Sequence, residues 1–240
     1  MGIGQDLFVF QIWTTDAIHA IMLVDFTLWR QVGKLAILYL VRHGQTDWNR
    51  QRRIMGRHPV PLNETGSQQV QRLALSLKSW PIEKMVSSPM LRTVESAKII
   101  SEALGLPFEE DEGLCEISVG EWEGKYWDQM DSDPVVKAFE TTPSITRPPG
   151  GETLTEVQNR AVKSIWRIIQ EAGISNLLLV SHADTIRAIL AHFIQMDLDP
   201  SRRFQIDNAS LSVIKINPIK SRLILMNYLA DPERIQGPQD

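Results

Sequence analysis

The sequence contains almost no cysteine: Cys115 is the only one in 240 residues. A single cysteine cannot form a disulfide within the chain, so the fold cannot depend on one. Free thiols are typical of a reducing compartment, and we therefore expect a cytoplasmic protein. Cys115 itself is expected to be a small buried apolar residue rather than a nucleophile.

The sequence also lacks an excess of positive charge. Its formal net charge is −4 and 22% of its residues are charged, so no general basic field would attract nucleic acid. No internal repeat, Walker-type glycine loop or cluster of metal ligands is present. We therefore predict a protein with no nucleic-acid partner, no cofactor and no bound metal.

No apolar stretch is both long and uncharged. Residues 8–29 are rich in apolar side chains, but Asp16 and Asp25 lie among them, and two central aspartates make a membrane span too costly. No Lys or Arg precedes this stretch, so a secretory signal also fits poorly. Two explanations of residues 1–33 stay open: an extra apolar segment that packs on the domain or a partner, or a start assigned too far upstream, with Val32 as the initiator. We favour the second.

The most informative segment that is present joins an apolar strand to three special residues. Residues 35–41 are nearly all apolar, as expected of a strand buried on both faces of an α/β sheet. Arg42, His43 and Gly44 follow directly. Ligand sites in open α/β sheets form beyond the carboxyl ends of strands, and a glycine allows the sharp turn needed there. The sequence thus predicts a site at this strand end.

Further strands and helices alternate along the chain. Asn63 is predicted to cap a helix, and a short strand at 84–86 leads to another helix in which Ser88 is the cap and Pro89 the first residue. Thr153 and Glu156 form a capping box at the start of a long amphipathic helix. A second buried strand at 176–180 ends near His182, and two closing strands are expected at 208–216 and 222–228.

Three motifs together resemble the histidine phosphatase superfamily. They are Arg42-His43-Gly44-x-Thr46-x-x-Asn49, Ser87-Ser88-Pro89-x-x-Arg92, and the strand that ends at His182. The resemblance implies an α/β domain over residues 34–230, a three-layer α/β/α sandwich with a mixed, mostly parallel sheet, followed by a polar tail at 231–240. Met55-Gly56 and Pro59 depart from the usual family residues, which leaves the substrate specificity open. Ala183, directly after His182, replaces a glycine that many relatives have there, and we expect the backbone to follow the same path.

The resemblance also implies roles for individual residues. His43 is the expected nucleophile, while the substrate's phosphoryl group is bound by a set of polar and basic side chains: Arg42, Asn49, Arg92 and His182. Spacing alone does not choose a proton donor among Glu116, Glu121 and Glu123, but the match to the family favours Glu116.

Arg187 is expected to face solvent. The arginines of residues 50–57 are interpreted either as a solvated loop or as a positive rim.

These observations predict a metal-independent phosphomonoesterase that acts through a phosphohistidine on a small phosphorylated metabolite. A cofactor-dependent phosphoglycerate mutase is the first alternative, although the connection at 124–150 is shorter than the insertion of such mutases. An inactive phosphoprotein-binding module is an alternative of another class. We expect no membrane association, and a homodimer stays open.

Overall fold

The strand predicted before His43 lies at the centre of a six-stranded sheet in the computed structural model, which describes residues 35–217 and 220–230. The strand order is β3-β2-β4-β1-β5-β6. The strands are β1 (Ala36–Arg42), β2 (Lys84–Ser87), β3 (Phe108–Glu110), β4 (Asn176–Ser181), β5 (Leu211–Ile216) and β6 (Arg222–Tyr228). The first four are mutually parallel, whereas β5 runs antiparallel to β1 and β6 antiparallel to β5. The predicted mixed, mostly parallel sheet is confirmed.

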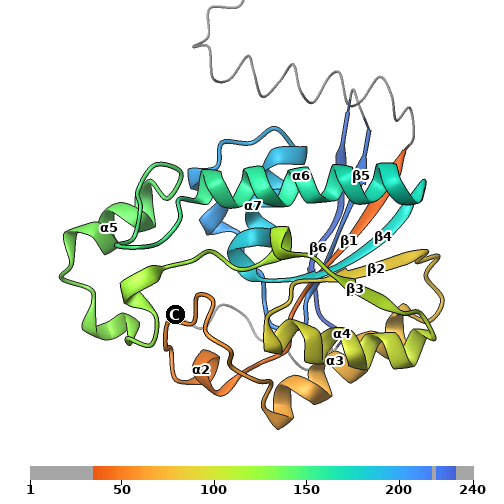
Figure 1. Cartoon of the computed structure of the whole chain (residues 1–240), viewed down its shortest axis with the longest axis horizontal. Helices are drawn as coiled ribbons and strands as arrows, with labels where there is room; N and C mark the ends of the chain where they lie inside the picture. Colours follow the sequence, from red (N-terminus) through yellow and green to blue (C-terminus); the bar gives the residue numbers. More distant parts are fainter. Residues whose placement is uncertain (1–34, 218–219, 231–240) are drawn as a thin grey trace, which may run out of the picture. The chain divides into compact units, whose positions relative to one another are not determined.

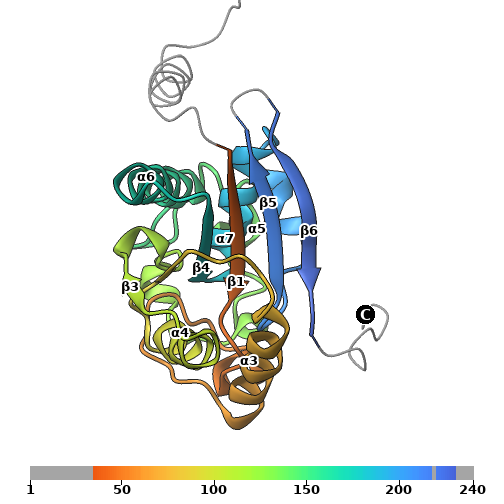
Figure 2. The same cartoon turned by 90° about the vertical axis from the view of Figure 1, so that its right-hand side faces the viewer.

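Helices cover both faces of this sheet (Figures 1 and 2), as expected for three layers. The helices are α2 (Asp47–Arg50), α3 (Glu64–Leu77), α4 (Leu91–Leu104), α5 (Pro134–Thr141), α6 (Leu154–Ala172) and α7 (Ala183–Phe193). In Figure 1, α3 and α4 lie below the strands and α6 lies above them. Short 3₁₀ turns occur at Glu112–Leu114, Gly120–Trp122, Trp127–Gln129 and Asp199–Arg203.

The central strands are apolar because both of their faces are covered. Tyr39 and Val41 of β1 belong to the core cluster with Leu73 of α3 and Ile100 of α4. Successive side chains of a strand point to opposite faces, so Leu40, which is 1% exposed, faces the other layer. The continuous apolar run in the sequence is thus the consequence of two helical layers.

The expected helix starts are confirmed at two positions and wrong at a third. Asn63 caps α3 by accepting a hydrogen bond from the Gly66 amide, and the capping box of Thr153 and Glu156 begins α6. However, α4 begins at Leu91, so Pro89 is not a helical residue and Ser88 is not its N-cap. The Ser88 hydroxyl instead contacts His182, which makes it part of the candidate site.

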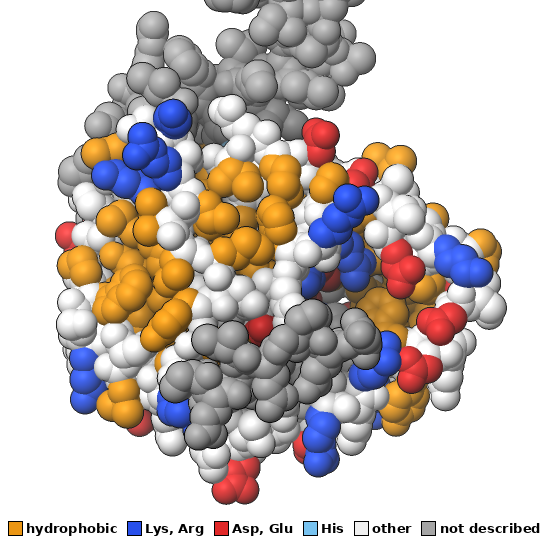
Figure 3. All heavy atoms as spheres, turned by 180° about the vertical axis from the view of Figure 1, so that it is seen from behind, with side chains coloured by type: hydrophobic (Ala, Val, Ile, Leu, Met, Phe, Trp, Pro, Cys, Tyr) orange, Lys and Arg blue, Asp and Glu red, His pale blue; other side chains and the backbone are white. Residues whose placement is uncertain are grey.

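The outer strand β6 leaves apolar side chains exposed. Figure 3 looks onto the side of the molecule where β6 lies and shows apolar side chains gathered on that face. Ile224 is 60% exposed and Tyr228 38% exposed. A homodimer, which the sequence leaves open, would find an apolar surface here.

Several predictions fall on residues that the structure does not describe. The N-terminal extension at 1–33, the turn at Pro218 and the polar tail at 231–240 lie outside the described residues. Within the described parts of the chain, no helix is long and apolar enough to cross a membrane. Nor do three or more His, Cys, Asp or Glu side chains group there as metal ligands.

Candidate active site

The two predicted site histidines lie side by side because their strands are neighbours. β1 and β4 are parallel with Arg42 opposite Ser181, so the next residue of each strand, His43 or His182, extends beyond the same edge of the sheet. Their ring centroids are 5.3 Å apart, and the His43 amide donates to the Ser181 carbonyl oxygen at 3.1 Å. Both side chains are buried.

The hydrogen bonds of His43 define which ring nitrogen is free of a proton. Nδ1 lies 2.7 Å from the Gly44 carbonyl oxygen, which can only accept, so Nδ1 carries the hydrogen. Arg92 Nε donates to Nε2 at 3.2 Å, so Nε2 presents its lone pair. Burial lowers the pKa of His43 well below its ordinary value of 6.5, and the charges of Arg92 and Arg42 lower it further. His43 is therefore neutral at pH 7.

Arg92 is a buried residue, not a surface one, although it lies in the first turn of α4. Besides contacting His43, its guanidinium donates from Nη1 to the His58 carbonyl oxygen at 3.1 Å and from Nη2 to the Gly56 carbonyl oxygen at 2.8 Å. The planar fork is thus held by the loop that follows α2. Burial lowers the pKa of Arg92 to about 10, so it keeps its charge at neutral pH.

Arg42 and His182 each present a buried nitrogen that has no hydrogen-bond partner among the described residues. These atoms are Arg42 Nε and His182 Nδ1. Arg42 Nη1 donates to the Ile206 carbonyl oxygen at 2.6 Å, and His182 Nε2 lies 2.8 Å from Ser88 Oγ. Burial, followed by the charge of Arg92, lowers the pKa of His182 well below its ordinary value. Arg42 Nε is a donor, and His182 Nδ1 is one when it carries the ring hydrogen. Unpartnered buried donors are costly unless a ligand satisfies them, and an anion would suit this site.

Glu116 is the acid that lies among these groups. Its Oε1 accepts from the Ile117 amide at 3.0 Å and lies 3.4 Å from Thr185 Oγ1. Burial raises the pKa of Glu116, and the nearby Asp184 carboxylate raises it further, against the opposing charges of Arg92 and Arg42. A raised pKa is what a general acid needs near neutral pH. Of the other two acids, Glu121 is exposed, and Glu123 accepts from the Arg57 amide and lies close enough to Arg92 for its charge to act on it.

Asn49 lies beside the site, but its oxygen is engaged in local structure. Oδ1 accepts from the Thr46 amide at 3.0 Å and from Asn208 Nδ2 at 3.2 Å, as part of the capping box that begins α2. Asn208 Nδ2 also lies 3.3 Å from the His43 carbonyl oxygen. Asn49 therefore orders the turn after His43, and direct contact with substrate stays a prediction.

Sequence reasoning misplaced Arg187 and overlooked an acid beside it. Arg187, expected at the surface, has a side chain only 17% exposed, pairs with Asp184 at 2.9 Å and donates to the Phe204 carbonyl oxygen. Burial would raise the pKa of Asp184, but the charges of Arg202 and Arg187 more than offset it, so the pKa lies below its ordinary value. The i, i+3 spacing on a helix was the available signal for this pair.

Two further residues near Glu116, namely Glu152 and Arg160, were not singled out from the sequence. Glu152 lies between Arg57 and Arg160 and forms ion pairs with both. Both arginines also donate to the Glu116 carbonyl oxygen. The arginines of residues 50–57 are thus held in place by partners: Arg50 by Asp47, Arg52 by Asp128, Arg53 by the Gly124 carbonyl oxygen, and Arg57 by Glu152.

The family model of the histidine phosphatase superfamily, branch 1, matches residues 38–229. The chain belongs to this superfamily. The predicted family and fold are thereby confirmed, as is the predicted enzyme class, a phosphoric monoester hydrolase of the histidine phosphatase type.

Relatives and solved structures agree with this membership. A protein of Yersinia pestis named probable phosphoglycerate mutase is 33% identical over 73% of this chain and 82% of its own length. The structure of Bacillus stearothermophilus YhfR is 30% identical, with a TM-score of 0.74, over 79% of this chain and 96% of that one. The structure of a mycobacterial glucosyl-3-phosphoglycerate phosphatase with vanadate is 26% identical, with a TM-score of 0.72, over 80% of this chain and 98% of that one.

Proposed function

We propose that this protein is a metal-independent phosphomonoesterase that transfers the phosphoryl group of a small metabolite to His43 Nε2 and then to water. The observation that carries the proposal is the protonation state of His43. Its Nδ1 hydrogen is fixed by Gly44, its pKa is lowered well below 6.5, and its Nε2 lone pair faces Arg92. A neutral imidazole with one defined lone pair is an activated nucleophile.

In the first step, Nε2 attacks phosphorus and the bond from phosphorus to the leaving oxygen breaks. Charge spreads over the phosphoryl oxygens in the transition state, and fixed cations there stabilise it. Arg42 and Arg92 supply two such charges, and His182 supplies an N–H when its hydrogen is on Nδ1. Protonated Glu116 gives its proton to the leaving alcohol oxygen, which its raised pKa favours.

In the second step, water attacks the phosphohistidine. The Glu116 carboxylate accepts a proton from that water, the bond from phosphorus to Nε2 breaks, and His43 regains its lone pair. Inorganic phosphate leaves, and the enzyme returns to its starting protonation state. Each step thus uses groups that the structure brings together at one end of β1 and β4.

The experiment that tests this scheme is trapping of the intermediate. Brief reaction with a ³²P-labelled monoester should give an acid-labile, base-stable phosphoryl group on His43. His43→Ala should abolish both labelling and turnover, whereas His192→Ala, on the last turn of α7, should retain both. Label on a serine would contradict the scheme, and absence of label and of turnover in the unchanged protein would favour the inactive phosphoprotein-binding module.

Phosphoglycerate mutase is the second candidate, because a 33% identical relative carries that name. A mutase must protect its phosphohistidine from water until the acceptor is rephosphorylated, which requires a covered site. Between Gly124 and Gly150 the chain forms an isolated bridge from Tyr126 to Arg53, one 3₁₀ turn and the eight residues of α5. We therefore expect phosphate release to outrun interconversion of 3- and 2-phosphoglycerate, even with the bisphosphate primer. Faster isomerisation in the same preparation would identify a mutase.

A further inference from the structure

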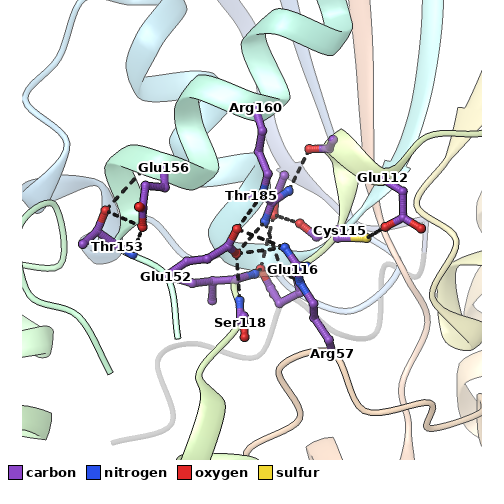
Figure 4. Close-up of polar contacts among 12 residues, drawn as sticks. Arg57, Glu112, Cys115, Glu116, Ser118, Glu152, Thr153, Glu156, Arg160 and Thr185 are labelled. Atoms are coloured by element: carbon purple, nitrogen blue, oxygen red, sulfur yellow. Dashed lines mark hydrogen bonds and ion pairs between the residues drawn. The ribbon is translucent and has the colours of Figure 1, made fainter. Parts of the chain in front are cut away.

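The Glu152 carboxylate joins three separate parts of the chain. It accepts from Arg57 Nη2 at 3.0 Å, from Arg160 Nε at 3.2 Å and from the Ser118 amide at 3.0 Å. Figure 4 shows it between Arg160, which comes from α6, and Arg57, which comes from the loop after α2. Its side chain is 21% exposed and that of Arg160 is 20% exposed, so water screens these contacts only in part.

The same two arginines converge on the backbone of Glu116. Arg57 Nε donates to the Glu116 carbonyl oxygen at 3.3 Å, and Arg160 Nη2 donates to it at 3.1 Å. Arg160 Nη1 also donates to the Gly113 carbonyl oxygen at 2.8 Å. Since Glu152 accepts from Ser118, the segment carrying Glu116 is held on both sides of that residue.

Two guanidinium groups on one carbonyl oxygen repel each other unless an anion lies between them. Glu152 is that anion. Burial acts to raise its pKa, but the hydrogen bonds from Ser118 and Arg160 and the charges of Arg160 and Arg57 more than offset this, so the pKa lies below its ordinary value. Glu152 therefore stays ionised at neutral pH and keeps both arginines in place.

The segment has no regular secondary structure, so tertiary contacts hold it. Thr185 Oγ1 donates to the Cys115 carbonyl oxygen at 2.7 Å and Ile117 packs in the core, and the two arginines add the contacts at Glu116 itself. Residues 115–119 lie between two 3₁₀ turns and belong to no strand or helix. Among the residues that the structure describes, the hydrogen bonds of the Glu116 carboxylate are one from the adjacent Ile117 amide and a long one from Thr185. The position of the Glu116 carboxyl group thus depends on how its backbone is anchored. A misplacement of about 1 Å can cost about 10²-fold in rate.

We propose that Glu152 is a positioning residue for proton donation, acting through Arg57 and Arg160 to fix Glu116 at the leaving oxygen. The inference rests on the function proposed for Glu116. It predicts that replacing Glu152 lowers kcat/KM most for substrates whose leaving group is strongly basic. An alkoxide needs the proton of Glu116, whereas p-nitrophenolate, a weak base, leaves readily without it.

The test compares kcat/KM of Glu152→Gln on an alkyl phosphate, β-glycerophosphate, and on p-nitrophenyl phosphate. We expect kcat/KM to fall about tenfold or more on the alkyl ester and less than about threefold on the aryl ester. A general acid contributes about 10²–10⁴-fold in rate, so the expected fall on the alkyl ester is part of the contribution of Glu116. Glu156→Gln is the matched control: it makes the same chemical change in the first turn of α6, at an exposed ion pair with Arg147, and glutamine can still complete the capping box with Thr153. It should leave both values unchanged.

Equal losses on the two esters, or no loss on either, would overturn the proposal. If Glu152→Gln does not fold, Arg57→Met decides by the same comparison, since methionine fills a similar space but donates neither to Glu152 nor to the Glu116 carbonyl oxygen. Glu116→Gln separates this inference from the proposed function. If it shows the same dependence on leaving group while Glu152→Gln does not, only the positioning role fails. If Glu116→Gln shows no such dependence, the role of Glu116 fails as well.

Discussion

Burial of two neutral histidines should make the stability of this protein depend on pH in a calculable way. The pKa values of His43 and His182 are both well below the ordinary 6.5, chiefly through burial. Below pH 6.5 the unfolded chain therefore binds protons that the folded protein does not. As far as the two histidines contribute, the free energy of unfolding is highest above pH 6.5 and falls as the pH falls toward their folded pKa values.

The magnitude follows from linkage. Each histidine that is protonated only in the unfolded state lowers the free energy of unfolding by about 1.4 kcal/mol per pH unit. The two together give about 2.7 kcal/mol per unit below pH 6.5. Glu116 acts in the opposite sense above its ordinary pKa of 4.5, because its pKa is raised in the fold. The contribution of a histidine is therefore best measured as a difference between variants.

Urea unfolding between pH 5 and 8 measures that difference. His43→Gln should remove about 1.4 kcal/mol per pH unit from the slope below pH 6.5, and His182→Gln should remove a similar amount. The double variant should lose both contributions. Stability curves that stay parallel to that of the unchanged protein over this range would refute the reasoning, because they would mean that the folded histidines accept protons as readily as unfolded ones.

Three further predictions concern the site and its surroundings. Arg92→Lys should lower kcat by about 10²–10³-fold, since it removes the guanidinium group that contacts His43 and the Gly56 carbonyl oxygen. A drop of less than about tenfold would contradict the role of Arg92. Activity should survive exhaustive chelation, and loss restored only by a divalent ion would contradict the cationic site. Gly151→Ala should lower the melting temperature, because a Cβ there would lie 2.5 Å from the Ser118 carbonyl oxygen, and an unchanged value would refute this close approach.

Strands and helix ends that depend on a few neighbouring residues could be predicted from the sequence alone. The apolar run at 35–41 predicted a strand covered on both faces, and the structure has this strand at Ala36–Arg42, with Leu35 exposed before it. The caps at Asn63 and Thr153 were readable because a capping residue and its partner are only three positions apart. The motifs containing His43 and Arg92 and the strand that ends near His182 resembled one family, and that resemblance implied a mixed, mostly parallel sheet, whereas the strand order came from the structure.

Only the tertiary structure decided which charged residues are buried. Arg92 has the local signature of an exposed first-turn residue, yet its partners Gly56 and His58 come from a distant loop. Spacing could not choose Glu116 from its neighbours either. The reason is that the contacts that hold it, such as the pair of Arg57 and Glu152, join positions 95 residues apart. Bonds across such separations leave no periodicity in the sequence, so they exist only once the sheet has brought the loops together.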